Sequence, residues 1–270
     1  MNYRHIYHAG NFADVMKHAL LLRLLAAMRR KPKPFLVLDT HAGIGRYDVT
    51  SEQAEKTGEW REGVGKLLEA PPSALAEYAE TVRRLGLYPG SPVFAAEALR
   101  LGDRLLACEL HPEDAATLRR IMRAYENVAV HERDGYEALG AFLPPPEKRA
   151  LVLVDPPFER TDEFSAAATA LAKASKKFPG GVYVLWYPVK HRAPTREFFE
   201  ALRLAGIKDV IAAEFLRRPD SDPTRLNGAG LAIINPPFGF ETEASPILAA
   251  CVTAFGEAGA SAAIERIINE

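Results

Sequence analysis

Short apolar runs alternate with longer helical stretches along most of this chain, and that alternation leaves few folds open to it. In the run from Leu151 to Val154 every residue is apolar and two are β-branched, which is typical of a strand buried in a parallel sheet. Right-handed crossovers then favour a doubly wound α/β fold with helices on both faces. We predict a mainly parallel seven-stranded sheet with strands at residues 35–39, 104–110, 128–131, 151–154, 181–187, 207–216 and 230–235.

The segment after the first strand is too long for a simple crossover to the second. Residues 47–90 are charged, helical and interrupted by prolines, so we expect an inserted helical subdomain within a single domain that spans residues 1–270. A helix is expected at residues 11–30, where Asn11 can cap the first turn. The Ala-rich tail, residues 245–269, is also predicted to be helical.

The composition argues against several classes of protein. No apolar run is long enough for a transmembrane helix, and the N-terminus lacks a signal-peptide pattern. Cys108 and Cys251 are the two cysteines of the chain, so we expect a cytoplasmic protein without a disulfide framework. We also expect a monomer with no membrane partner.

The charge is unevenly distributed, although the net charge of -1 does not indicate a nucleic-acid-binding protein. Residues 1–33 hold seven lysines and arginines against one acid, Asp14. This excess favours an anion-binding surface, with Arg4, Lys17 and the run Arg29-Arg30-Lys31 as candidate contacts for a polyanion such as RNA. A solvated helix face followed by a basic linker explains the same pattern equally well.

Acidic residues end or closely follow four predicted strands, at Asp39, Glu109, Asp134 and Asp155. Ligands of doubly wound sheets bind at the carboxyl ends of the strands, so these acids are expected to meet at one edge of the sheet. One or two such acids arise by chance. Four in succession indicate a single site.

A glycine-containing turn, Asp39-x-His41-x-Gly43-x-Gly45, follows the first strand. Glycines let backbone N–H groups approach a ligand closely. His41 stands where a dinucleotide fingerprint has its first glycine, which disfavours a pyrophosphate site. An acid followed by two glycines is the turn that S-adenosylmethionine enzymes use, although a plain strand-to-helix turn remains open.

The next two acids, Glu109 and Asp134, can each bind a different part of S-adenosylmethionine. Glu109 can accept both hydroxyls of a ribose. Asp134 can accept the adenine amine of the cofactor while Gly135 makes room for the ring. A surface acid at Glu109 and an Asp-Gly turn at Asp134 are the alternatives.

The sequence Asp155-Pro156-Pro157-Phe158 matches a pattern found in enzymes that methylate adenine amino groups. The adenine amine is a poor nucleophile, and its nitrogen becomes positive as it takes the methyl group. The Asp155 carboxylate and the Pro156 carbonyl can accept its two hydrogens and stabilise that charge, and Phe158 can stack on the base. The base must leave its stack, so a single-stranded, looped or flipped target is expected, and no metal is needed.

A second copy of the pattern, Asn235-Pro236-Pro237-Phe238, ends the last predicted strand. In methyltransferase sheets that strand is antiparallel to its neighbours, so its carboxyl end faces away from the cofactor edge. We therefore expect a structural role for Asn235 and the catalytic role for Asp155.

Eight segments in chain order carry a more specific pattern. They are Tyr3-Arg4-His5-x-x-His8-Ala9-Gly10-Asn11-x-Ala13-Asp14-Val15-x-Lys17-His18, Asp39-Thr40-His41-Ala42-Gly43, Tyr88-Pro89-Gly90-Ser91-Pro92, Glu109-Leu110-His111-Pro112, Asp155-Pro156-Pro157, Leu185-Trp186-Tyr187-Pro188, Pro219-Asp220-Ser221-Asp222 and Asn235-Pro236-Pro237. Together they resemble the bacterial 23S ribosomal RNA adenine-N6 methyltransferase family of the RlmJ type, over nearly the whole chain.

The resemblance implies a class I, Rossmann-like methyltransferase fold with a helical insert, S-adenosylmethionine as donor, and adenine 2030 of 23S rRNA as target. It implies RNA contact by Tyr3 and proton acceptance by Asp155. The family usually has tyrosine where this chain has Phe158, which keeps the ring and loses the hydroxyl. The cofactor contacts that it implies are His18, His41, Ser91, Glu109, Asp134 and Gly135, beside Gly43 of the glycine turn.

Two other functions remain open from the residues alone. A DNA adenine-N6 methyltransferase would use the same catalytic motif, although no separate base-reading domain is visible. A non-catalytic RNA-binding or ribosome-assembly factor could keep the cofactor pocket without turnover. A nicotinamide oxidoreductase is disfavoured because the glycine turn lacks the G-x-G-x-x-G motif that binds dinucleotides.

Overall fold

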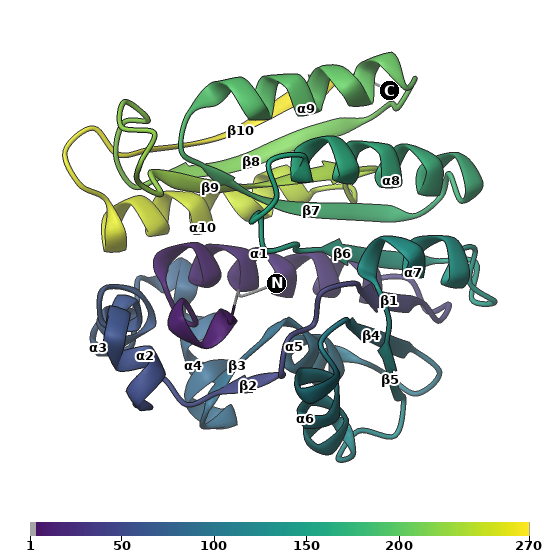
Figure 1. Cartoon of the computed structure of the whole chain (residues 1–270), viewed down its shortest axis with the longest axis horizontal. Coiled ribbons are helices and arrows are strands. Elements are labelled where there is room, and N and C mark those ends of the chain that lie inside the picture. The colour runs from purple at the N-terminus through teal and green to yellow at the C-terminus, as the bar shows by residue number, and fades with distance from the viewer. Residues whose placement is uncertain (1–3, 270) are drawn as a thin grey trace.

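The computed structural model describes residues 4–269 and is built on an eight-stranded sheet of order β10-β8-β9-β7-β6-β1-β4-β5 (Figure 1). The pairs among β7, β6, β1, β4 and β5 are parallel, whereas β9 is antiparallel to both β7 and β8, and β10 is antiparallel to β8. The strands are β1 (Leu36–Asp39), β4 (Arg104–Glu109), β5 (Val128–Glu132), β6 (Ala150–Val154), β7 (Val182–Val189), β8 (Val210–Leu216), β9 (Gly228–Ile234) and β10 (Ser261–Ile268).

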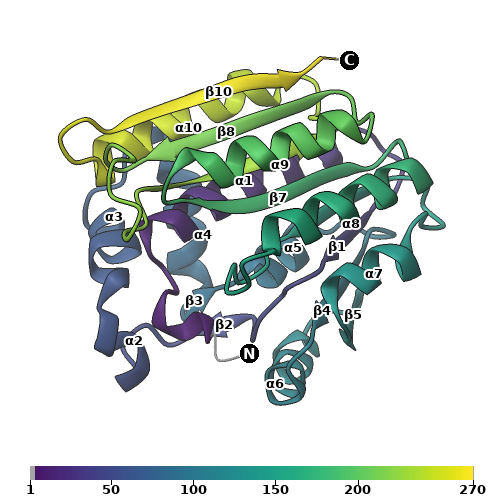
Figure 2. The same ribbon diagram turned by 45° about the horizontal axis from the view of Figure 1, so that its top comes forward.

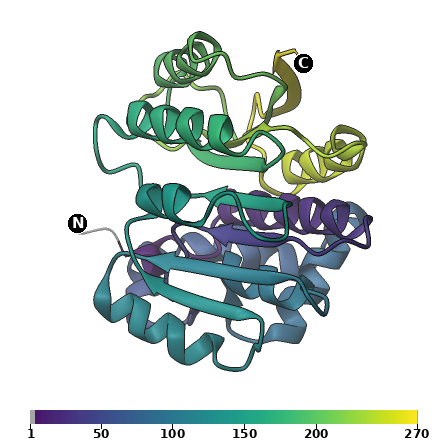
Figure 3. The ribbon, with the colours of Figure 1, turned by 90° about the vertical axis from the view of Figure 1, so that its right-hand side faces the viewer.

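Helices cover both faces of the sheet, as the predicted doubly wound fold requires (Figure 3). Buried side chains of one group of helices share a core with one face of the strands: α1 (Phe12–Arg29), α5 (Ser91–Ala98), α6 (Pro112–Met122) and α10 (Phe240–Phe255). The second core lies under α7 (Gly135–Phe142), α8 (Glu163–Lys177) and α9 (Arg192–Leu204). Strand β6 is buried along its full length because it lies between these two cores.

The first helix begins where the sequence predicts. Asn11 caps α1 by accepting hydrogen bonds from the backbone N–H groups of Ala13 and Asp14, at 3.0 and 2.9 Å. Most residues of α1 are buried, because the helix is enclosed by the sheet, α5 and α10. Its first turns therefore place polar side chains inside the protein rather than on its surface.

The segment between β1 and α5 forms short helices closed off by a two-stranded ladder (Figure 2). Its backbone packs on the N-terminal segment: the Val64 N–H donates to the Gly10 carbonyl at 2.8 Å, and a Cβ at Gly63 would lie 2.1 Å from that oxygen. We propose that residues 47–90 form an inserted subdomain. Its elements are β2 (Arg46–Tyr47), α2 (Glu52–Thr57), α3 (Lys66–Glu69), α4 (Ala76–Leu85) and β3 (Tyr88–Pro89).

Two predictions about the C-terminal part were wrong. The tail is not helical to residue 269, because α10 ends at Phe255 and the chain then returns as β10. The sheet accordingly has eight strands and not seven. Alanines favour a helix locally, but Ser261–Ile268 pairs with the otherwise open edge of β8, and this long-range pairing overrides the local propensity.

The antiparallel direction predicted for the last strand before the tail is confirmed. Asn235, directly after β9, therefore lies at the amino-terminal edge of the parallel strands. Its side-chain amide donates to the carbonyls of Pro179 and Gly181, just before β7 begins, at 2.8 and 2.7 Å. Phe238 of the same motif is 97% exposed.

The basic run at residues 29–31 also lies at that remote edge. Arg30 donates to the Phe238 carbonyl at 2.9 Å and pairs with Glu243, while Arg100 donates to the carbonyls of Arg29 and Lys31. The run is therefore separated from the carboxyl ends of the strands by the length of α1. Within residues 4–269, no helix is both long and apolar enough to cross a membrane.

Candidate active site

A cavity of about 590 Å³ lies at the carboxyl ends of β1, β4, β6 and β7 and is closed on one side by the N-terminal segment and the insert. It brings together nearly all the residues that the sequence singled out. Those that line it are Lys17, His18, His41, Gly43, Ser91, Glu109, Asp134, Gly135, Asp155, Pro156 and Phe158.

Two of the predicted RNA contacts are not among the described residues that line this cavity. Tyr3 lies outside the described residues. Arg4 does not line the cavity and pairs with Glu113 and Asp114 of α6, at 3.2 and 3.1 Å. Its contact with RNA stays a prediction.

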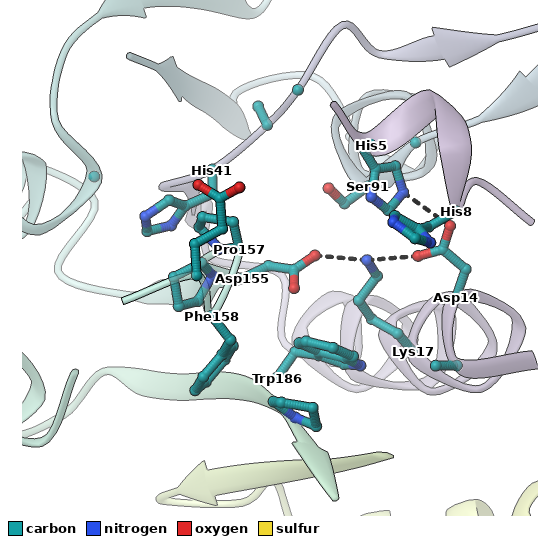
Figure 4. A pocket seen from close by; sticks show the side chains of 18 of the residues that line it. His5, His8, Asp14, Lys17, His41, Ser91, Asp155, Pro157, Phe158 and Trp186 are labelled. Carbon is teal, nitrogen blue, oxygen red and sulfur yellow. Dashed lines mark hydrogen bonds and ion pairs between the residues drawn. The ribbon is translucent and has the colours of Figure 1, made fainter. Parts of the chain in front are cut away.

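Lys17 is the centre of a buried charge cluster (Figure 4). Its Nζ lies 2.8 Å from Asp14 Oδ1, three residues earlier on α1, and 2.5 Å from Asp155 Oδ2 at the end of β6. The Lys17 side chain is only 4% exposed. The ammonium that we expected to contact RNA therefore faces two carboxylates within the cavity wall.

The two partners on α1 stabilise each other's charged forms. Burial alone would lower the pKa of Lys17, but the carboxylates of Asp14 and Asp155 raise it above its ordinary value. Burial would likewise raise the pKa of Asp14, but the charges of His5 and Lys17 hold it well below the usual range. A lysine that stays charged fixes one oxygen of Asp155.

The N-terminal segment and the insert meet at Glu59. Its carboxylate lies 2.9 Å from His8 Nδ1 and accepts a hydrogen bond from the Asn11 side chain at 2.9 Å. His5 Nε2 lies 2.9 Å from Asp14 Oδ2. The hydrogen bond to Glu59 raises the pKa of His8 despite its partial burial.

The glycine turn after β1 is held against β4. The backbone N–H groups of Gly43 and His111 donate to the two oxygens of Glu109, at 3.0 and 2.8 Å. Gly43 has a φ of 60°, and a Cβ there would lie 2.2 Å from the Tyr47 hydroxyl, so only glycine fits. Burial raises the pKa of Glu109, and its carboxylate is fixed at the cavity wall.

Asp134 caps α7 through one of its oxygens. Oδ1 accepts the backbone N–H groups of Tyr136 and Glu137, at 2.9 and 3.0 Å. A Cβ at Gly135 would lie 2.4 Å from the Thr40 carbonyl and 2.6 Å from the His41 ring. Glycine is thus required here by close contact with the loop after β1, in addition to any space that it leaves for a ligand.

Beneath the cavity, Ser91 donates a 2.7 Å hydrogen bond to Asp39 Oδ2. Asp39 is 1% exposed, and its other oxygen has no hydrogen-bond partner within residues 4–269. Burial raises the pKa of Asp39 to about 7, against the opposing effect of the Ser91 hydrogen bond.

The two histidines of the predicted cofactor site are held neutral. Burial lowers the pKa of His41 to about 4, and its Nδ1 lies 2.7 Å from Thr40 Oγ1. Burial also lowers the pKa of His18 well below the usual value, and its Nδ1 lies 3.0 Å from the Tyr88 hydroxyl. Neutral rings so placed can contact a ligand without adding positive charge to it.

An aromatic wall adjoins Asp155. The Phe158 ring packs against Phe164 and Trp186, with centroids 4.7 and 5.8 Å away. Phe158 has a φ of 49°, a left-handed conformation that costs a bulky residue of order 1 to 3 kcal/mol. Strain of this kind persists where the surrounding structure over-determines it, as two prolines and two aromatic rings do here.

Several cavity residues were missed in the sequence as site members. Asp14 was noted only as the one acid among residues 1–33 and as part of a matching motif, although its i,i+3 spacing from Lys17 could have indicated the pair. Trp186 was noted only as part of a matching motif; its indole N–H is buried without a partner within residues 4–269. Glu59 lies in the insert, and no local signal identifies it.

Comparison with known proteins gives concordant results. Residues 32–268 match the family model described as Ribosomal RNA large subunit methyltransferase D, RlmJ. The chain is 41% identical over 257 residues to Ribosomal RNA large subunit methyltransferase J of Haemophilus influenzae, an alignment that covers 92% of each chain. It is 39% identical to the protein of that name in Escherichia coli K12, over 92% of this chain and 91% of that one.

A solved structure is similar over almost the whole chain. The crystal structure of protein LPL1258 from Legionella pneumophila superposes with a TM-score of 0.88 and is 38% identical in sequence. The superposition covers 96% of this chain and 98% of that one.

Proposed function

The chain belongs to the RlmJ family of ribosomal RNA large subunit methyltransferases, and from this premise we propose that it methylates the N6 amino group of an adenine in 23S rRNA, with S-adenosylmethionine as donor. The target that we propose is adenine 2030, the position that the resemblance to this family implies. One observation carries the proposal: the Asp155 carboxylate opens onto the same cavity as Glu109 and Asp134, the two acids suited to a nucleoside.

The residues of the cavity fit this cofactor. Glu109 is an oriented carboxylate that can accept ribose hydroxyls, and Asp134 keeps one oxygen, Oδ2, outside its capping hydrogen bonds. His18, His41 and Ser91 complete the polar wall. When bound, S-adenosylmethionine supplies a methyl group activated by the positive charge of its sulfonium.

Asp155 acts on the adenine amine. Lys17 holds Oδ2 of Asp155, so Oδ1 accepts one amine hydrogen while the Pro156 carbonyl accepts the other. The carboxylate stabilises the positive charge that develops on the amine nitrogen, and a group fixed before the reaction needs no reorganisation. Two prolines fix the backbone that carries both acceptors.

The target base would lie along the aromatic wall. Phe158 and Trp186 line the cavity beside Asp155, with Pro188 and Leu226 further out. Stacking on such rings tolerates any base, so we assign selection of the amine to Asp155 and Pro156. A ring suffices for stacking, so Phe158 can take this role without the hydroxyl of a tyrosine.

Methyl transfer to purified RNA tests the function. With labelled donor and protein-free 23S rRNA, the wild-type protein should label one adenine, and mass mapping of rRNA from a strain that lacks the protein should show that same adenine unmodified. Asp155→Asn keeps the shape of the side chain but removes its charge, and should reduce the transfer rate by about 100-fold or more.

Asn235→Ala alters the second Pro-Pro-Phe motif and should leave the rate unchanged. Unlabelled RNA, or equal rates for Asp155→Asn and wild type, would refute the proposal. Stronger labelling of duplex DNA than of rRNA would instead identify a DNA methyltransferase.

A further inference from the structure

Two exposed cations lie on one side of the cavity mouth. Lys190 directly follows β7 and lines the cavity. Arg225 belongs to the loop between β8 and β9, and its neighbours Thr224 and Leu226 both line the cavity. We call these two cations and their supporting loop, residues 222–227, the Lys190–Arg225 ridge.

The ridge has a preformed backbone. Asn227, which is 0% exposed, donates from its side-chain amide to the carbonyls of Lys190 and Asp222, at 2.8 and 2.7 Å, and its N–H donates to the Val189 carbonyl at 2.9 Å. The Asp222 carboxylate accepts the N–H and the hydroxyl of Thr224, at 3.0 and 2.6 Å. These bonds fix the loop to the end of β7, so the backbone that carries the two cations is in place before any ligand arrives.

Neighbouring arginines are already neutralised by acids. Arg192 pairs with Glu214 and Asp220, and both Arg217 and Arg218 pair with Glu257. On other sides of the cavity, Arg4 pairs with acids of α6 and Arg160 with Asp162.

Lys190 and Arg225, in contrast, form no ion pair with any acid between residues 4 and 269. Arg225 acts electrostatically on Asp222 and Glu257, but it lies within ion-pair distance of neither. Cations that form no ion pair can bind phosphate without first giving one up. They release counterions from the nucleic acid when they do so.

We propose that the Lys190–Arg225 ridge binds the RNA phosphates that flank the target adenine, an inference that rests on the proposed function. The apolar residues Trp186, Pro188 and Leu226 line the cavity between the ridge and Asp155. A base extruded from its stack passes over these residues to Asp155, while its charged backbone remains at the mouth on the ridge. The RNA thus approaches from the side of β7 and the β8–β9 loop, and the run at residues 29–31 takes no part.

The test is RNA binding by the full-length Lys190→Ala/Arg225→Ala variant. The control, Lys176→Ala/Lys208→Ala, removes two exposed cations at the amino-terminal edge of the sheet and causes the same change in net charge. Affinity for a fragment of 23S rRNA is measured by fluorescence anisotropy at salt concentrations from about 50 to 200 mM. Affinity for S-adenosylmethionine is measured in parallel by calorimetry.

The ridge variant should bind RNA more weakly, and the slope of log affinity against log salt should shrink by roughly 0.7 for each lost phosphate contact. Its affinity for S-adenosylmethionine should equal that of wild type, which shows that the fold is intact. The inference is overturned if wild type does not bind the fragment, if the ridge variant keeps the wild-type slope, or if the control loses as much. If RNA binding depends on the ridge but wild type transfers no methyl group, the inference about phosphate binding is supported and the proposed methyltransferase activity is refuted.

Discussion

The ammonium of Lys17 lies 2.5 Å from Oδ2 of Asp155, across 138 residues of sequence. The same ammonium lies 2.8 Å from Asp14 Oδ1 and is almost fully buried. In this arrangement α1 fixes the orientation of the carboxylate at the end of β6. Lys17 is thus a positioning residue, and Asp155 is the residue that we expect to touch the substrate.

Replacement of Lys17 by methionine should both destabilise the protein and slow methyl transfer. Removing one partner of a buried ion pair costs about 3 to 5 kcal/mol, because the remaining charges lose their compensation. Urea unfolding measures the stability change. A double-mutant cycle with Asp155→Asn, on kcat/KM, measures the coupling and should give a non-additive result.

Arg23→Met is the matched control on the same helix, because Arg23 pairs with Glu77, whose side chain is 63% exposed. A surface pair of this kind contributes about 1 kcal/mol or less. Additive effects of Lys17→Met and Asp155→Asn would show that the two residues do not act together.

Glu109→Gln should weaken binding of S-adenosylmethionine while the fold remains intact. The amide keeps one acceptor oxygen, so it loses one of the two backbone hydrogen bonds that orient the group, from Gly43 and His111. It also loses the charge that strengthens hydrogen bonds to ribose hydroxyls, and such charge-assisted bonds contribute about 1.5 to 3 kcal/mol. Calorimetry should therefore show an affinity lower by roughly one to two orders of magnitude. Glu126→Gln, at an exposed position before β5, should bind as wild type does, and equal affinities for both variants would remove Glu109 from the site.

Phe158→Ala and Phe238→Ala separate the two Pro-Pro-Phe motifs. Phe158 lines the cavity, whereas Phe238 is 97% exposed at the opposite edge of the sheet. Loss of base stacking costs about 1 to 3 kcal/mol, so Phe158→Ala should lower kcat/KM for RNA by roughly 10- to 100-fold. Phe238→Ala should leave kcat/KM unchanged, and a comparable loss in both variants would contradict the assignment.

The strand ends were predictable because each depends on local chemistry. Apolar runs mark the buried strands, and Asp39, Glu109 and Asp155 stand where those runs stop. Parallel strands then place their carboxyl ends at one edge, so the common cavity follows from the alternation of strands and helices. The antiparallel direction of β9 likewise separated Asn235 from Asp155.

The remaining features depend on contacts between distant segments. Nothing in the local sequence predicts that α1 packs against the end of β6, so the ion pair of Lys17 with Asp155 could not be expected. The pairing of β10 with β8 opposes the helical preference of its alanines. Asp14 is the clearest case. Its position in the first turn of α1 predicts a favourable interaction with the helix dipole, yet its main partners are the side chains of Lys17 and His5.

The buried carboxyl of Asp39 should make stability depend on pH in a defined direction. Its pKa is raised by burial from 3.8 to about 7 in the folded protein. The folded state therefore keeps a proton that the unfolded chain releases near pH 4, and the contribution of Asp39 to stability is present at low pH and is lost as the pH rises toward 7.

The test compares wild type with Asp39→Asn, which cannot titrate. The free energy of unfolding of wild type minus that of the variant should fall between about pH 4 and pH 7, by a few kcal/mol, since each unit of pKa corresponds to about 1.4 kcal/mol. Ser91→Ala removes the hydrogen bond that favours the charged carboxylate, so the decline should extend to higher pH in that background. A difference that stays constant from pH 4 to 7, or that rises, would contradict the assignment of a raised pKa to Asp39.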